Sequence, residues 1–195
     1  GLKTGDGPGV EADDTVAALV ESLRAEAETD AEAAAYDDLD AELAEALSEL
    51  RLMKDDYEIT QMREAVAATI DGFAKVVPAL PTATGHRRGE RVTETTFDAH
   101  ARLEGNTVGY ETIAAAGEHA TTLHWIRNDG QVRTGELVLL DAGVEVDSLY
   151  TADVTRTLPV DGTYTDVQRR IYTAVLDAAD AAFAVAVPGA RFHDI

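Results

Sequence analysis

The sequence contains no cysteine among its 195 residues, which excludes disulfide bonds and thiolate metal sites. The absence of disulfide bonds fits a reducing compartment. Long apolar runs are also missing: no segment approaches the roughly 20 apolar residues that a membrane helix needs. No basic stretch precedes a short apolar one, as in a signal peptide. We therefore expect a cytoplasmic protein without a membrane partner.

Basic residues are scarce, with 16 Lys and Arg against 37 Asp and Glu and a net charge of −21. Such a charge repels nucleic acids and anionic membranes, so both are excluded as partners. Residues 1–58 hold 18 Asp and Glu against 4 Lys and Arg, a net charge of −14. The rest of the chain therefore has the charge of an ordinary acidic enzyme. Apolar residues make up 45% of the chain, which is enough for a hydrophobic core.

The first part of the chain, residues 1–51, is predicted to be an acidic helical segment, the end of an N-terminal domain or a linker. Between residues 13 and 52, Ala, Glu and Leu dominate and apolar residues recur at helical spacing. Asp37 and Asp38 interrupt the pattern, which predicts two helices with an N-cap at Asp38. A disordered acidic interaction tail is the alternative, but such tails seldom keep an apolar stripe like the leucines of residues 39–50.

Two further helices are expected before the sequence pattern changes. The apolar stripe of residues 55–77 predicts one helix, which Pro78 and Pro81 should end. Residues 92–103, opened by Thr93, predict the other.

The remainder of the chain has the hydrophobic pattern of strands, followed by one more helix. The expected strands lie at residues 109–115, 123–125, 136–140, 144–146, 150–152 and 154–158. Thr165 should cap a helix that runs to about residue 187. The residues of this helix that are expected to face inward are Ile171, Val175, Ala178 and Phe183. Helices, then a meander of strands, then a helix predict an α+β fold with an antiparallel sheet.

Two aspartates in the strand region are candidate metal ligands. Asp141 directly follows the apolar run of residues 137–140, where an unpaired charge is costly to bury, so a cation or dense hydrogen bonding is expected around it. Asp153 lies on a neighbouring β-rich run. Two carboxylates that converge from adjacent strands form an oxygen-rich site for a divalent metal. Asp147 lies in a polar bend and is interpreted as a turn residue, which is also the alternative for Asp153.

The strongest motifs surround these aspartates, LDAG at residues 140–143 and YTADVTRTLPVDG at residues 150–162. Further motifs in register are EITQMREA at 58–65, GYETI at 109–113, GEHA at 117–120, LHW at 123–125, QRRIY at 168–172 and VPGA at 187–190. Together these motifs resemble the Xaa-Pro aminopeptidases. These enzymes belong to the pita-bread metallopeptidases, with methionine aminopeptidases, prolidases and creatinases. The resemblance covers residues 52–195.

The resemblance implies the first half of a pita-bread fold, a curved antiparallel sheet flanked by helices. It implies two divalent metal ions, usually manganese, with Asp141 binding one ion and Asp153 bridging both. An activated water would then cleave a peptide with an N-terminal Xaa-Pro sequence. His124 matches a catalytic histidine that donates to the substrate, Tyr110 a tyrosine beside the bridging aspartate, and Thr155 a residue that orients Asp153. From the sequence alone, a core histidine and a core tyrosine are the alternatives.

The family's remaining ligands, a histidine and two glutamates, follow the turn at Pro188 and Gly189, and the chain ends at Ile195 before them. We therefore expect an inactive fragment with two of five metal ligands, from a parent protein that is a homo-oligomer. A prolidase, a non-catalytic protein-binding module and a metal-free, creatinase-like hydrolase are the alternatives. Retention of both aspartates disfavours the last two. His119 and Trp125 are given structural roles.

Overall fold

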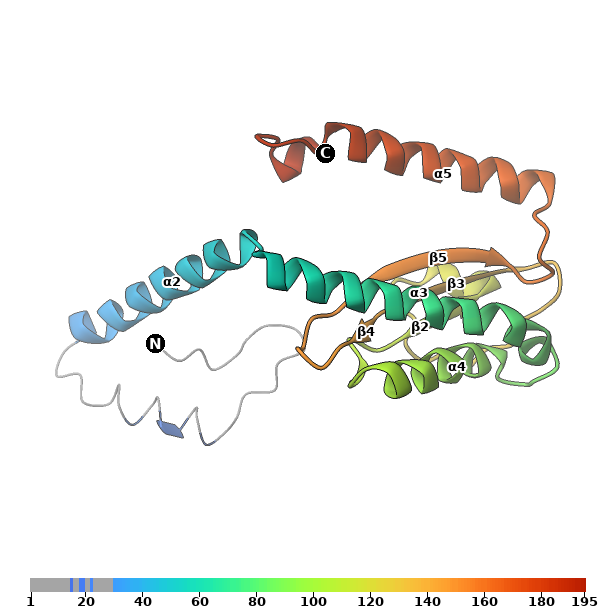
Figure 1. Ribbon diagram of the computed structural model, residues 1–195, viewed down its shortest axis with the longest axis horizontal. Helices are drawn as coiled ribbons and strands as arrows, with labels where there is room; N and C mark the ends of the chain where they lie inside the picture. The colour runs from blue at the N-terminus through green and yellow to red at the C-terminus, as the bar shows by residue number, and fades with distance from the viewer. Residues whose placement is uncertain (1–14, 16–17, 20–21, 23–29) are drawn as a thin grey trace. The chain divides into compact units, whose positions relative to one another are not determined.

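The computed structural model describes residues 30–195, together with residues 15, 18, 19 and 22 (Figure 1). Most of the first expected helix, before residue 30, therefore lies outside the described residues. The chain divides into two compact units, residues 1–57 and 58–195. Within the described part, no helix is both long and apolar enough to cross a membrane.

The first unit contains helix α2, Asp30–Leu52. The expected break at Asp37 and Asp38 is wrong, because the helix runs through both residues. An aspartate inside a helix costs at most about 0.7 kcal/mol, and the neighbouring Ala, Glu and Leu residues are strong helix formers. The leucines of the stripe, Leu39, Leu43, Leu47 and Leu50, are exposed.

Helix α3, Asp56–Thr84, contains both prolines that were expected to end it. A proline inside a helix removes one backbone hydrogen bond and costs about 3 kcal/mol or more. Leu80 and Ala83, which lie beyond Pro78 on the same helix, are buried in the hydrophobic core. Packing of this last part of α3 offsets the cost of the prolines, so tertiary contacts decide where the helix ends.

Helix α4, Gly89–Glu104, begins three residues before the expected start. Thr93 is buried inside the helix, and its hydroxyl donates to the carbonyl oxygen of Gly89 at 3.3 Å, so the expected cap at Thr93 is wrong. Phe97 of α4 packs edge-on against Phe73 of α3, with ring centroids 5.7 Å apart. Figure 1 shows the two helices side by side.

The main sheet has three antiparallel strands in the order β2-β3-β5, which are Ile113–Ala116, Leu137–Ala142 and Val154–Pro159. Strands β1, Thr107–Val108, and β4, Val144–Glu145, pair in a smaller antiparallel sheet. The expected α+β class and antiparallel arrangement are confirmed.

Two of the expected strands do not form. Residues 123–125 lie outside the strands of the described chain, and His124 has a φ of +53°, in the left-handed region that strands do not use. Residues 150–152 contribute only an isolated bridge, between Thr151 and Glu145. The segment before β3 therefore crosses the surface as a loop, and it begins with a 3-10 helix, η1, Gly117–Thr121.

The hydrophobic core lies between the two helices and one face of the main sheet. Burial alternates along β3, and Val138, Leu140 and Ala142 pack in one cluster with buried residues of α3 and α4. Because successive side chains of a strand point to opposite faces, Leu139 and Asp141 belong to the face away from these helices. The core thereby determines which residues of β3 are available for chemistry.

Helix α5, Asp166–Val185, begins at the cap that the sequence predicts. The Thr165 hydroxyl accepts from the backbone N–H of Gln168 at 3.3 Å, and the Gln168 side-chain oxygen accepts from the N–H of Thr165 at 2.9 Å. The expected inward orientation of its apolar residues is wrong, because no described residue covers them. Exposed positions include Ile171, Val175, Ala178 and Phe183. A short 3-10 helix, η2, Phe192–Asp194, follows.

Gly143, between β3 and β4, allows two backbone segments to approach closely. A Cβ atom added there would lie 1.6 Å from the carbonyl oxygen of Ala152. We expect Gly143→Ala to lower the free energy of unfolding by about 1–3 kcal/mol, because overpacking forces the backbone to move. Gly85→Ala is the matched control, since its nearest atom would be 3.6 Å away. Urea denaturation measures both variants, and equal stabilities would contradict the close approach.

Candidate metal centre

Strand pairing on both sides of β3 determines the direction of the Asp141 side chain. It is the fifth residue of β3 and pairs with Ile113 of β2 and Thr155 of β5. Its neighbours Leu140 and Ala142 are fully buried on the helix side of the sheet. A shift of one residue would expose these two side chains and bury the carboxylate, so the hydrophobic pattern fixes the register. Asp141 is consequently half-buried on the face of the main sheet that points away from α3 and α4, which we call the open face.

Asp153 directly precedes β5 and is exposed. Thr155, two residues later, lies opposite Asp141 in the pairing of β3 with β5. Residues two apart in an extended chain share a face, so Asp153 is a diagonal neighbour of Asp141 on the open face. The register of two strands therefore brings together the two carboxylates that the sequence singles out.

The hydroxyl of Tyr110 lies between the two carboxylates. Its oxygen is 2.7 Å from Oδ1 of Asp141 and 2.9 Å from Oδ1 of Asp153. Tyr110 follows β1, and the N–H of the preceding Gly109 donates to the carbonyl oxygen of Gly143 at 2.9 Å, which ties this segment to the connection between β3 and β4. Burial raises the pKa of Tyr110, and the hydrogen bonds to Asp141 and Asp153 raise it further. The phenol therefore stays protonated and acts as a donor.

The cluster of Asp141, Asp153 and Tyr110 has more acceptor oxygens than protons. The phenol carries one proton, which cannot satisfy both carboxylates at once. Carboxylate oxygens are the ligands that hard divalent cations prefer, so this donor set fits such a cation. Among the described residues, no group of three or more His, Cys, Asp or Glu side chains is arranged to hold a metal. The role of Asp141 and Asp153 as metal ligands stays a prediction.

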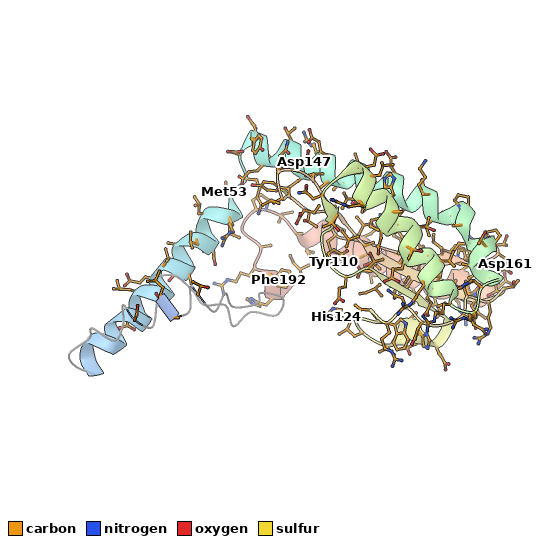
Figure 2. All side chains as sticks on the ribbon, turned by 90° about the horizontal axis from the view of Figure 1, so that it is seen from below. Met53, Tyr110, His124, Asp147, Asp161 and Phe192 are labelled. Carbon is orange, nitrogen blue, oxygen red and sulfur yellow. The ribbon has the colours of Figure 1, made fainter. Side chains whose placement is uncertain are left out.

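His124 is exposed and lies three residues beyond the 3-10 helix η1, Gly117–Thr121. Figure 2 labels both His124 and Tyr110, and they lie toward the same end of the folded unit, away from Asp161. Within the described part of the chain, the His124 imidazole forms no hydrogen bond with Tyr110 or with either carboxylate. Its role toward a substrate stays a prediction.

Thr155 and Asp147 complete the residues singled out from the sequence. Thr155 is exposed opposite Asp141 in the strand register, and its expected role in orienting Asp153 stays a prediction. Asp147 lies exposed in the turn that follows β4.

Sequence reasoning missed the buried residue Glu90, the second residue of α4. Its side chain is fully buried and contacts His119 and Trp125, to which the sequence assigns only structural roles. The local sequence offers no signal for this cluster. An acidic residue in the first turn of a helix is ordinarily an exposed side chain that interacts with the helix dipole. The contacts of Glu90 come from a loop more than twenty residues away in the chain.

A sequence profile of metallopeptidase family M24 matches residues 60–195, and the chain belongs to this family. Xaa-Pro aminopeptidase 2 of Streptomyces coelicolor is 57% identical over 155 residues, which are 80% of this chain and 33% of the relative. Xaa-Pro aminopeptidase 1 of the same organism is 55% identical over 155 residues, 80% of this chain and 31% of the relative. The chain thus spans about a third of the length of these relatives.

Solved structures show the same fold. Zinc-substituted aminopeptidase P of Escherichia coli in complex with product aligns with a TM-score of 0.64 at 32% identity, over 72% of this chain and 31% of that chain. A putative aminopeptidase P of Bacillus anthracis aligns with a TM-score of 0.68 at 30% identity, over 91% of this chain and 39% of that chain. The structure therefore corresponds to part of the pita-bread fold.

The raised pKa of Tyr110 predicts that this residue does not ionise with ordinary tyrosines. Up to about pH 11, the folded wild type and Tyr110→Phe should gain the same tyrosinate absorbance. In concentrated guanidinium chloride, the wild type should gain the absorbance of one more tyrosine. Because the pKa of Tyr110 is higher in the folded state, its protonated phenol contributes to the free energy of unfolding. This contribution is fully present below the unfolded pKa of about 10 and is lost as the pH rises above that value. A larger increment for the folded wild type would contradict the assignment.

Proposed function

We propose that the protein is a metal-dependent Xaa-Pro aminopeptidase, which releases the N-terminal residue of peptides with proline in the second position. The observation that carries this proposal is the shared contact of the Tyr110 hydroxyl with Asp141 and Asp153 on the open face of the sheet. The names of the relatives at 55–57% identity support the choice of substrate class.

We infer that Asp141 and Asp153 hold divalent metal. In this proposal the complete site would take two manganese ions, and Asp141 and Asp153 would help to hold them. When bound, the metal supplies the Lewis acidity that lowers the pKa of the attacking water and polarises the scissile carbonyl. These two residues are two of the five ligands that we assign to the complete site. Their oxygen atoms suit manganese, and the phenol contact brings both to one place.

The remaining residues of the site act through hydrogen bonds. Tyr110 keeps its proton, which reduces the repulsion between the carboxylates of Asp141 and Asp153 and orients them. His124 is exposed, so a peptide can reach it, and it donates a hydrogen bond to the substrate as negative charge develops on the scissile peptide group. Thr155, which lies on β5 two residues after Asp153, orients the Asp153 carboxylate.

We also propose that residues 52–195 are the N-terminal half of a pita-bread catalytic domain and that residues 1–51 precede it as an acidic helical segment. The division of the structure after Tyr57 and the family match from residue 60 support this boundary.

The proposal predicts metal-dependent turnover that requires both aspartates. In the full-length protein with manganese, Asp141→Asn and Asp153→Asn should each lower kcat on an Ala-Pro-Ala peptide by more than about 100-fold. Loss of a residue that merely supports a ligand already costs about 10- to 100-fold. Asp147→Asn is the matched control and should keep wild-type kcat, because Asp147 lies exposed in a turn outside the cluster.

The same assay separates the alternatives. Cleavage of the dipeptide Ala-Pro without cleavage of the tripeptide would identify a prolidase. A wild-type protein that binds manganese in calorimetry but cleaves neither peptide would reject the aminopeptidase and support a non-catalytic binding module.

A further inference from the structure

Glu90 is a fully buried carboxylate with a complete set of donors. Its Oε1 accepts from the backbone N–H of Ala116 at 2.8 Å and lies 2.7 Å from Nδ1 of His119. Its Oε2 accepts from the indole N–H of Trp125 at 2.9 Å and from the backbone N–H of Gly130 at 2.6 Å. A buried carboxylate without such partners would be strongly unfavourable, so these contacts form as a set.

All four donors belong to one segment, residues 116–130, which starts at the last residue of β2, includes η1 and carries His124. The contacts hold the start of the loop through Ala116, its middle through Trp125 and its end through Gly130. In return, the backbone N–H of Glu90 donates to the carbonyl oxygen of Gly130 at 3.1 Å. One side chain on α4 therefore contacts this segment at its start, middle and end.

A second buried side chain fastens the same loop to strand β2. Asn128 is fully buried, its Oδ1 accepts from the N–H of Ala114 at 2.9 Å, and its Nδ2 donates to the carbonyl oxygen of Thr112 at 2.8 Å. Asn128 holds the backbone beside β2, whereas Glu90 reaches Trp125, the residue next to His124. Glu90 is thus the closer support of the candidate catalytic residue.

His124 needs such support, because its imidazole has no hydrogen bond with Tyr110, Asp141 or Asp153 that would hold it in place. It is exposed and has a φ of +53°, which residues other than glycine rarely adopt. The Trp125 ring stacks on the ring of His119, with centroids 3.9 Å apart, and both rings contact Glu90. The chain on either side of His124 is therefore tied to one buried carboxylate.

We propose that Glu90 is a positioning residue that holds His124 in place for the substrate, an inference that rests on the proposed function. A carboxylate is required at this position. Glutamine offers one acceptor oxygen, and its NH2 group would face two N–H donors. Aspartate is one methylene shorter and cannot reach all four donors.

The central experiment is a double-mutant cycle in the full-length protein with manganese. Glu90→Gln should lower kcat on Ala-Pro-Ala by about 100-fold, the effect of a displacement of about 1 Å in a catalytic group. In a His124→Ala background the same substitution should have no further effect, because Glu90 acts through His124. Glu118→Gln is the matched control, since Glu118 is exposed in the same loop, and it should leave kcat unchanged.

A spectroscopic measurement follows the loop independently of activity. Trp125 is the only tryptophan of these 195 residues, and its indole N–H signal in a nitrogen-15 correlation spectrum of the full-length protein, identified by its loss in Trp125→Phe, reports on its hydrogen bond to Glu90. Glu90→Gln should move this signal upfield and lower the heteronuclear NOE of the His124 amide, while Glu118→Gln should change neither. Manganese binding, measured by calorimetry, should be unaffected, because the metal-binding cluster is not altered.

The outcomes are distinguishable. An equal loss of kcat in the wild-type and His124→Ala backgrounds, or unchanged kcat in Glu90→Gln, would overturn the positioning role. If the wild type cleaves no Xaa-Pro peptide, the proposed function fails, and the NOE of His124 alone decides whether Glu90 holds the loop. If Glu90→Gln does not fold, Trp125→Phe replaces it in the cycle. This variant removes one donor and should lower kcat about 10-fold, again only when His124 is present.

Discussion

Six residues of β3 pair with six of β5 in an antiparallel ladder, and the candidate site depends on this pairing. The buried residues Leu140 and Ala142 hold one face of β3 against the helices, which leaves Asp141 on the other face. The ladder then places Thr155 opposite Asp141, and Asp153 becomes a diagonal neighbour of Asp141. Hydrophobic packing on one side of the sheet thus determines the arrangement of charges on the other. The Tyr110 hydroxyl, held at the end of β1, joins the two carboxylates.

The second unit contains carboxylates with two different hydrogen-bonding environments. Glu90 has a donor for each of its main acceptor positions, four in all, and it is fully buried. Asp141 and Asp153 share a single phenol proton, and they are half-buried and exposed, respectively. A saturated carboxylate organises the backbone around it, whereas an undersatisfied pair keeps the capacity to bind a cation. This difference in hydrogen bonding distinguishes a supporting acid from candidate metal ligands in a chain with a net charge of −21.

Patterns local to the sequence predict most of the elements correctly. The strands at Asp141 and Asp153 and the cap at Thr165 form where expected. The errors occur where distant contacts decide the outcome. Helix α3 continues through Pro78 because the residues beyond it are buried in the core. The expected strand at His124 is a loop, in which the Trp125 side chain and the Gly130 backbone donate to Glu90, a residue of α4.

By itself, the sequence predicted the class of fold, singled out Asp141 and Asp153 and indicated the protein family. It could do so because the apolar period, the helix caps and the motif residues are local properties of the chain. It also singled out Tyr110 and His124, through motifs that resemble those of known enzymes. Only the tertiary structure decided that one phenol proton serves both aspartates, and that a distant glutamate fastens the loop of His124. Hydrogen bonds between residues thirty or more positions apart depend on strand register and helix packing, which no local pattern contains.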